Sequence, residues 1–372
     1  MPTPEDIARL TSLVLLATFA LSALLGAIVH RTNFCTMGAI SDALNMGHWD
    51  RMRQWALAAG VAMIGFGALA AWGAIRAQDA VYASPRWMWL SAVVGGLLFG
   101  FGMVLASGCG SKLLVRMGAG SLKAFVAFLA MAISSYATLR GITAVWRDST
   151  VDRVFTEFDG SANVGNLLGT GLGWSPPMAL LICGAVLGLA LIGWALYRRD
   201  FWQGRNLLAG FGVGSIIVAM WWVSGHLGYV AEHPATLEPA YLASRTGRME
   251  ALTFTSPMAY TIDWLMFFSD ANQRLSIAVV SVFGVLVGAA AHAFFTRRFR
   301  WDGFKTTEDL ANHLIGGTLM GIGGVTALGC TIGQGLSGIS TLSLTSFTAV
   351  ASIIAGAVLA LKYQYWRLSR DV

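Results

Sequence analysis

The chain has 372 residues, of which 56% are hydrophobic and only 12% are charged. Soluble domains carry about 25% charged residues, so this composition argues strongly against a water-soluble enzyme, and the apolar content excludes a disordered chain. Four dispersed cysteines without a C-x-x-C pair predict neither a disulfide scaffold nor a zinc site. The net charge of +6 is interpreted as Lys and Arg anchoring one membrane face, and no nucleic-acid partner is expected.

Nine apolar runs have the length of a membrane-spanning helix, which needs about 20 mostly apolar residues. The first run is expected to be a retained span, because the preceding sequence, MPTPEDIAR, is acidic where a secretory signal is basic. The sequence therefore predicts an all-α polytopic membrane protein with about nine transmembrane helices, near residues 10–30, 54–75, 87–106, 121–146, 177–197, 206–227, 275–296, 310–328 and 344–366.

Short semi-apolar pieces between these spans are too short to cross a bilayer. They lie near residues 33–47, 109–118, 256–269 and 330–341. Irregular backbone at membrane depth is tolerated only where it is buried in protein or lines a wet cavity. We therefore predict that these pieces are re-entrant half-helices, and we expect aqueous connections at 147–175 and 229–250.

The distribution of basic residues predicts the orientation in the membrane. With nine spans the two ends of the chain lie on opposite faces. Of the 25 Lys and Arg residues, 16 then fall on the face shared with the C-terminus. The C-terminus is therefore expected to be cytoplasmic and the N-terminus outside.

The chain contains an internal repeat at an offset of 221 residues. Of the fifteen positions 95–109, nine are identical to their counterparts in 316–330, where chance would give about two. The identical residues of the first copy are Gly95, Gly96, Leu98, Gly100, Gly102, Val104, Ala106, Gly108 and Cys109. The same offset relates Asp42 to Asp263.

The two copies are predicted to point in opposite directions. The matched runs are the third and the eighth predicted spans, and this odd difference gives an inverted repeat, which places a binding site near the midplane. We expect one membrane domain, divided into a first repeat (1–146), a connecting loop with an extra span (147–205) and a second repeat (206–372). Close helix packing also explains the glycines, but not why each run ends in Gly-Cys before a broken segment.

Three of the four cysteines stand at the start of a candidate short helix. Cys35 lies in NFCTMG, Cys109 in GCGS and Cys330 in GCTIGQG. At a helix start, free N–H groups and the positive dipole end favour an anion and lower a thiol pKa. Cys183, in the apolar LICG, is interpreted as an inert core thiol. Small-residue packing is the alternative interpretation of the other three.

The offset of 221 places Ser256 opposite Cys35. Ser256 is followed by proline, an order typical of a helix cap and first helical position. We predict an approximate two-fold ring of Cys35, Cys109, Ser256 and Cys330 near the midplane. The predicted site also includes residues that adjoin these cysteines: Thr36, Gly110, Ser111, Thr331, Gly333 and Gln334.

Such a ring suits a soft anion better than a metal ion. Thiols are weak, polarizable hydrogen-bond donors, and weak successive sites allow an ion to leave as well as to bind. Thiolates also bind soft cations, but helix starts repel cations and no Met/His-rich entrance adjoins the cysteines. The sequence therefore predicts no metal site and no cofactor.

Charged residues near the predicted site have two interpretations each. Lys112 and Arg116 either attract anions or anchor the protein to lipid headgroups, and the second is favoured. Asp42 and Asp263 either couple transport to an ion or cap helices, and capping is favoured.

Taken together, these motifs resemble the YeeE/YedE sulfur-transport family, which includes thiosulfate uptake proteins. The resemblance covers nearly the whole chain. It rests on HRTNFCTMG at 30–38, on the Gly-Gly to Gly-Cys runs at 95–110 and 316–335, and on Thr255-Ser256-Pro257. The chain departs from the usual Gly-Gly-Cys, because Ser107 and Leu328 occupy the first of those positions.

The resemblance implies a multi-pass inner-membrane protein of a bacterium, surrounded by lipid, that takes up thiosulfate or a similar small sulfur anion. It further implies that Cys35, Cys109 and Cys330 hydrogen-bond the ion through their S–H groups. Relatives often work with a soluble sulfur carrier of the TusA type, which is a possible partner. Links of the family to selenium metabolism leave a selenium compound as an alternative cargo.

Two other function classes compete with transport. One is a membrane sulfurtransferase in which a cysteine becomes a persulfide; it needs a thiolate with a neighbouring base, and the sequence places none beside the three cysteines. The other is a scaffold subunit, for which large aqueous docking domains would be expected. We therefore predict a transporter and not an enzyme.

Overall fold

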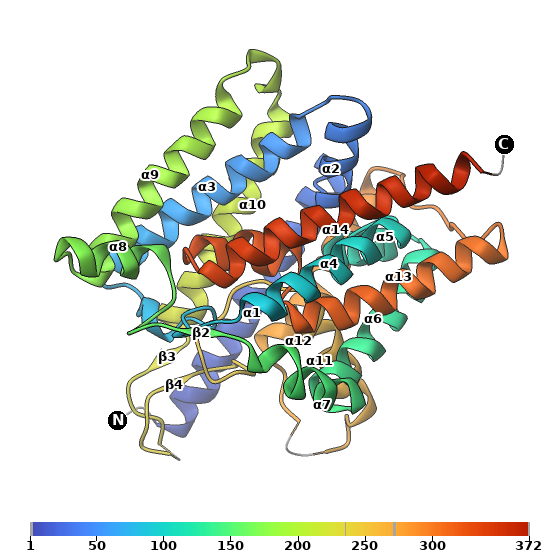
Figure 1. Ribbon diagram of the computed structural model, residues 1–372. Coiled ribbons are helices and arrows are strands. Elements are labelled where there is room, and N and C mark those ends of the chain that lie inside the picture. The colour runs from blue at the N-terminus through green and yellow to red at the C-terminus, as the bar shows by residue number, and fades with distance from the viewer. Residues whose placement is uncertain (1–2, 235, 271–272, 371–372) are drawn as a thin grey trace.

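The computed structural model describes residues 3–234, 236–270 and 273–370. The outer limits of the two predicted repeats, residues 1 and 372, lie outside the described residues. Helices dominate the described chain (Figure 1). In chain order they are α1 (Pro4–Thr32), α2 (Thr36–Asn45), α3 (Asp50–Ala71), α4 (Trp89–Leu105), α5 (Gly110–Gly118), α6 (Leu122–Arg140), α7 (Ile142–Ser149), α8 (Val164–Leu172), α9 (Pro176–Leu196), α10 (Gly204–Trp222), α11 (Thr255–Met266), α12 (Ile277–Phe295), α13 (Thr307–Thr326) and α14 (Leu344–Leu368).

Short elements complete the fold and confirm its all-α class. Strands β1 (Arg86–Trp87) and β2 (Thr156–Glu157) form one antiparallel pair, and β3 (Tyr229–Val230) and β4 (Ala240–Tyr241) form another. Each strand has only two residues, so the pairs tie loops together and form no sheet-based core. The remaining elements are the 3₁₀ turns η1 (Ala77–Asp79), η2 (Val151–Arg153) and η3 (Arg199–Phe201) and the π-helical turns η4 (Val223–Leu227) and η5 (Gly333–Gly338).

Within the described residues, eight helical segments are long and apolar enough to cross a membrane, against nine predicted. The eighth predicted span, 310–328, is the one missing from this set, although it does form a helix, α13. Its first turns carry Glu308, Asp309 and His313, which lower its mean hydropathy. The other eight predicted spans correspond to Pro4–Asn45, Asp50–Ala71, Trp89–Gly118, Leu122–Arg140, Pro176–Leu196, Gly204–Leu227, Ile277–Phe295 and Leu344–Arg367.

Helices α4 and α13 cross so closely that no side chain fits between them. A Cβ atom added to Gly102 would lie 2.6 Å from the Gly316 carbonyl oxygen, and one added to Gly316 would lie 2.6 Å from the Gly102 oxygen. Gly95 and Gly323 form the same reciprocal contact at 2.6 Å in both directions. Small residues allow this approach, which is common in membrane helix pairs.

The remaining long helices enclose this crossing. Figure 1 shows α4 between α14 and α13, and α13 also packs against α6. On the other side of the molecule α1 packs along α12, and α3 packs against both α9 and α10. The short helices α2, α5 and α11 and the turn η5 lie between long helices along the chain. The residues directly before α2, α5 and α11 (Cys35, Cys109 and Phe254) are buried.

Candidate functional site

Each of three cysteines immediately precedes a short helix. Cys35 precedes α2, Cys109 precedes α5, and Cys330 precedes the helical segment 331–340, whose centre is η5. Their carbonyl oxygens accept the first intrahelical hydrogen bonds, from Ala39 N at 2.9 Å, Leu113 N at 2.9 Å and Gln334 N at 2.7 Å. Such a carbonyl bond is the signature of a residue that caps a helix start.

A left-handed turn two residues upstream directs the chain into each of these positions. Asn33, Ser107 and Leu328 have φ values of 57°, 55° and 59°. Asn tolerates this conformation, whereas Ser and Leu adopt it at a cost of order 1 kcal/mol or more. In return, the turn lets one helix end and the next begin within about three residues.

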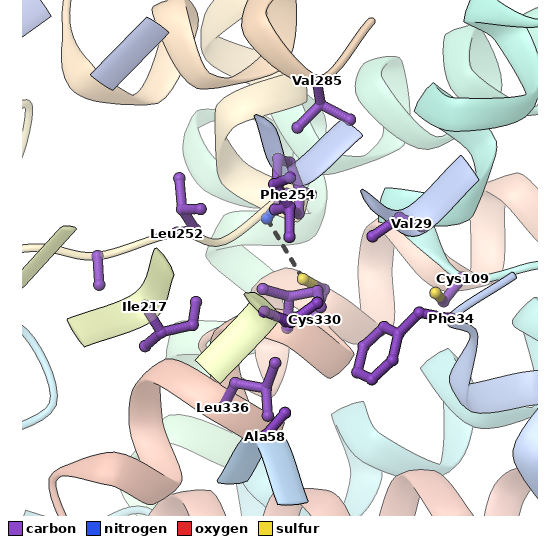
Figure 2. Close-up of a cluster of buried hydrophobic side chains, with 14 of the residues drawn as sticks. Val29, Phe34, Ala58, Cys109, Ile217, Leu252, Phe254, Val285, Cys330 and Leu336 are labelled. Atoms are coloured by element: carbon purple, nitrogen blue, oxygen red, sulfur yellow. Dashed lines mark hydrogen bonds between the residues drawn. The ribbon is translucent and has the colours of Figure 1, made fainter. Parts of the chain in front are cut away.

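The three thiols lie together in the protein interior. Cys35, Cys109 and Cys330 are buried. The Cys109 sulfur lies 3.4 Å from Ser111 Oγ and within hydrogen-bonding reach of the Cys35 thiol and the Thr331 hydroxyl. Figure 2 shows Cys330 across from Cys109, with the Phe34 ring and other apolar side chains around them. The predicted ring of Cys35, Cys109, Ser256 and Cys330 around an ion path stays a prediction.

Cys330 Sγ accepts hydrogen bonds from two backbone amides. The Phe254 N–H donates at 3.3 Å (dashed in Figure 2) and the Gly333 N–H at 3.4 Å. Cys35 and Cys109 have the same relation to the N–H groups of Gly38 and Lys112, three residues on. Each sulfur therefore lies over the electropositive start of its helix.

The residues predicted beside the cysteines have different roles. The Thr36 and Thr331 hydroxyl oxygens are both buried; that of Thr36 makes no hydrogen bond to any described residue, and that of Thr331 lies within reach of the Cys109 sulfur. They also line an apolar cavity of about 310 Å³ next to the thiols. Gly110 begins α5, and a Cβ atom there would approach Met131 Cε to 3.2 Å. Thr36 thus has an unpaired hydroxyl, Thr331 adjoins the Cys109 sulfur, and Gly110 provides space.

Gly333 and Gln334 support the Cys330 turn. A Cβ atom on Gly333 would collide with Thr253 Oγ1 and lie 3.2 Å from the Tyr82 hydroxyl, so only glycine fits. Gln334 is fully buried; its Nε2 donates to the Ala327 carbonyl at 2.6 Å and its Oε1 accepts from Ser346 Oγ at 2.5 Å. Because both ends of its amide are occupied, Gln334 positions the turn.

The expectation that Ser256 caps a helix is wrong. Helix α11 begins at Thr255, so Phe254 occupies the cap position and Ser256 lies in the first turn. Phe254 is held there because its N–H donates to Cys330 Sγ. Ser256 instead lines a cavity that it shares with Gln334.

Two cavities that include charged and polar side chains lie on two sides of the thiols. The first, the Arg86 cavity, measures about 280 Å³ and is lined by Tyr82, Arg86, Arg147, Ser256 and Gln334 among others. The second, the Arg51 cavity, measures about 300 Å³ and is lined by Thr32, Asn33, Asp42, His48, Asp50, Arg51, Gln54, Arg205 and Asn206. The Arg51 cavity adjoins the first turn of α3, and the Arg86 cavity adjoins the loop beyond its end. A helix of 22 residues is about 33 Å long, so the cavities lie at opposite ends of the bundle.

For Lys112 the sequence favoured lipid headgroups over anions, and the structure places this residue beside two of the cysteines. Its Nζ donates to Asn33 Oδ1 at 3.2 Å, and its charge acts on both Cys35 and Cys109. The sequence contained a signal for this position: Lys112 follows Cys109 by three residues, and residues three apart share a helix face. Cys183 is also buried, but it lies in α9 among apolar neighbours.

Asp42 and Asp263 are both held by arginines. The Arg51 guanidinium lies 3.3 Å from Asp42, and the Arg245 guanidinium lies 2.8 Å from Asp263. Asp263 also accepts hydrogen bonds from the Tyr136 hydroxyl at 2.9 Å and from Gln273 Nε2 at 3.3 Å. These ion pairs tie the far ends of α2 and α11 to the surrounding chain.

Replacing Arg245 by glutamine is expected to destabilise the protein by about 3–5 kcal/mol, because it leaves the Asp263 carboxylate buried without its cation. The Asp263 side chain is only 4% exposed. Thermal unfolding in detergent measures this effect. The control is Arg51→Gln, which should cost only about 0–1 kcal/mol because Asp42 and Arg51 are 25% and 36% exposed. Equal losses in the two variants would contradict the prediction.

Comparisons with known proteins agree with this architecture. Residues 31–359 match the family described as Sulphur transport. The chain is 27% identical over 361 residues to the thiosulfate transporter TsuA of Escherichia coli (strain K12), covering 96% of each chain. It is 29% identical over 272 residues to the thiosulfate transporter TsuA of Spirochaeta thermophila, covering 71% of this chain and 74% of that one. The chain therefore belongs to the Sulphur transport family of multi-pass membrane proteins.

Proposed function

We propose that this protein imports thiosulfate, or a closely similar sulfur anion, across a bacterial inner membrane. The observation that carries the proposal is the group of three buried thiols, each at a helix start, between two cavities that both contain arginine side chains. The named function of the TsuA relatives supports thiosulfate as the cargo. The charge distribution supports a cytoplasmic C-terminus and an external N-terminus.

The thiols replace part of the water that the anion loses on entering the protein. From the Arg86 cavity the ion meets Cys330 with its two amide donors, and then the pair Cys35 and Cys109. S–H groups and helix-start N–H groups donate to the anion, while the terminal sulfur of thiosulfate contacts the polarizable thiols. Because S–H donors are weak, the ion can pass from one to the next without covalent change.

We further propose that the two halves of the chain form an inverted repeat. The reciprocal glycine contacts support it: Gly95 contacts Gly323 and Gly102 contacts Gly316, and the offset of 221 relates these two contacts to each other. The same offset relates α4 to α13 within three residues at each end, and it aligns the start of α6 with the start of α14 to within one residue. Symmetry of this kind brings interrupted helices together at the midplane.

The test of the proposed function is uptake of radiolabelled thiosulfate by purified protein in liposomes. Uptake is expected to exceed that of empty liposomes, and unlabelled thiosulfate should compete more strongly than sulfate, which lacks the terminal sulfur. Selenate and selenite, added as competitors, test the alternative cargo. Equal competition by sulfate and thiosulfate would contradict a soft-anion path.

One observation favours a second candidate, a sulfurtransferase. Lys112 lies close enough for its charge to stabilise a thiolate at Cys109. Such a thiolate would attack the terminal sulfur of thiosulfate, forming a cysteine persulfide while sulfite leaves with the electrons of the broken S–S bond. Mass spectrometry after incubation with thiosulfate decides between the two: a transporter acquires no stable extra sulfur atom, whereas a sulfurtransferase does. A TusA-type sulfur carrier stays a prediction of the family resemblance.

A further inference from the structure

A carboxyl group lies beside the path where the sequence predicted only an aqueous connection. Glu250 is half-buried and stands near the end of the loop that leads into α11. Its backbone N–H donates to Ser224 Oγ of η4 at 2.8 Å, and its Oε1 accepts from the Arg245 N–H at 3.3 Å. Four residues later in the same loop, the Phe254 N–H donates to Cys330 Sγ. These bonds fix the Glu250 backbone in the loop that also contacts Cys330.

No cation neutralises this carboxylate within the part of the chain that the structure describes. The groups facing it are Tyr82 from the loop before β1, Tyr260 of α11 and Ser244 of its own loop, while Ser224 of η4 binds the Glu250 backbone. The Arg245 guanidinium is bound to Asp263 and lies over the Tyr260 ring, 5.2 Å from its centre. The carboxylate is therefore surrounded by groups that are uncharged near neutral pH.

Burial raises the pKa of Glu250 to about 7, so this group changes charge in the physiological range. Burial, together with the negative charge of Glu250, raises the pKa of Tyr82 far above its usual value, which keeps that phenol neutral. Tyr82 also lines the Arg86 cavity. An anion that moves from this cavity to Cys330 thus passes Tyr82, a side chain that lies near both Cys330 and Glu250.

We propose that Glu250 is a proton-binding site that couples proton and anion import. This inference rests on the proposed function. With Glu250 ionised, its negative charge repels an anion at Cys330; with Glu250 protonated, the repulsion disappears and the anion enters. The proton then leaves to the inside before the next cycle.

Coupling to protons would supply the energy that import of thiosulfate requires. Thiosulfate carries two negative charges, so an inside-negative potential of about 100 mV opposes its import by about three orders of magnitude in concentration. A co-transported proton cancels one of these charges, and a proton gradient adds further driving force. An uncoupled path through the same thiols would instead favour loss of the ion.

The test uses liposomes that contain the full-length protein and a trapped pH-sensitive dye. Addition of external thiosulfate is expected to acidify the lumen of wild-type liposomes. Wild-type uptake should fall roughly tenfold between an external pH of about 8 and about 9, because the protonated fraction of a group with a pKa near 7 falls by that factor. Uptake by Glu250→Gln, which mimics the protonated form, should be independent of pH and should not acidify the lumen.

Two controls keep the outcome interpretable. Glu238→Gln, on an exposed position of the same loop, should retain both acidification and pH dependence. Glu250→Asp should retain them as well, because it still titrates; size-exclusion profiles check that each variant is folded. If wild-type protein takes up thiosulfate without acidification and Glu250→Gln has the same pH profile, the coupling inference is overturned while the proposed function stands. If wild-type protein takes up no thiosulfate at all, the proposed function itself fails.

Discussion

Replacing Cys330 by alanine is expected to lower thiosulfate uptake about 100-fold. The change removes a thiol that faces the path and leaves the Phe254 and Gly333 N–H groups buried without their acceptor. A lost polar contact with unpaired buried partners costs about 1–3 kcal/mol, and each 1.4 kcal/mol corresponds to a factor of ten. Radiolabelled uptake in liposomes measures the loss directly, and growth of a sulfur-auxotrophic bacterium on thiosulfate measures it in cells.

The matched control for this experiment is Cys183→Ala. Cys183 is also buried and free, but it lies in α9 away from the other thiols, so uptake should stay close to wild type. Cys35→Ala and Cys109→Ala should fail as Cys330→Ala does, since all three sulfurs lie at helix starts. Cys330→Ser retains an O–H donor and should keep part of the activity. Uptake that survives removal of all three thiols would refute the role assigned to them.

Replacing Gly316 by valine is expected to prevent folding. The added Cβ atom would lie 2.6 Å from both the Ala106 amide nitrogen and the Gly102 carbonyl oxygen, and neither backbone atom can move alone. Overpacking typically costs about 1–3 kcal/mol where side chains can shift. A clash with backbone on both contacts should reach at least the upper limit. Fluorescence-detected size exclusion in detergent should show aggregate or no protein.

Gly193→Val provides the control for the glycine experiment. Gly193 lies in the last two turns of α9, is exposed, and has no atom within 4 Å of a Cβ built on it. Valine there adds an apolar side chain toward lipid, so expression and size-exclusion profile should match those of the wild-type protein. A folded, active Gly316→Val protein would show that the α4–α13 crossing tolerates separation, and would remove the packing argument.

The positions of helix starts were readable because local chemistry decides them. Cys35 and Cys109 follow residues that end one helix and precede residues that begin the next, and the structure places α2 and α5 directly after them. Ser256 was placed wrongly as a cap for a tertiary reason. The Phe254 amide binds Cys330 Sγ, a contact between residues 76 positions apart, and this contact fixes where α11 begins.

The span prediction also separates what the sequence alone determines from what depends on tertiary contacts. Composition alone identified the eight apolar segments, since hydropathy averages over a whole helix and needs no knowledge of neighbours. Helix α13 carries polar first turns that its environment accommodates: Asp309 lies 2.7 Å from Lys123 of α6, a partner that hydropathy cannot register. The glycines of α4 were visible in the sequence, but only the crossing with α13 shows which of them admit no side chain.

What the sequence determined by itself was therefore the membrane class, the helices and the cysteines that begin short ones, because these follow from hydropathy and from bonds within a few residues. What only the tertiary structure decided was which charges stand alone. Asp42, Asp263 and Glu250 look alike in the sequence, yet arginines neutralise the first two, while Glu250 lies among uncharged groups. A carboxylate's proton affinity depends on every charge and dipole around it, and those come from distant parts of the chain.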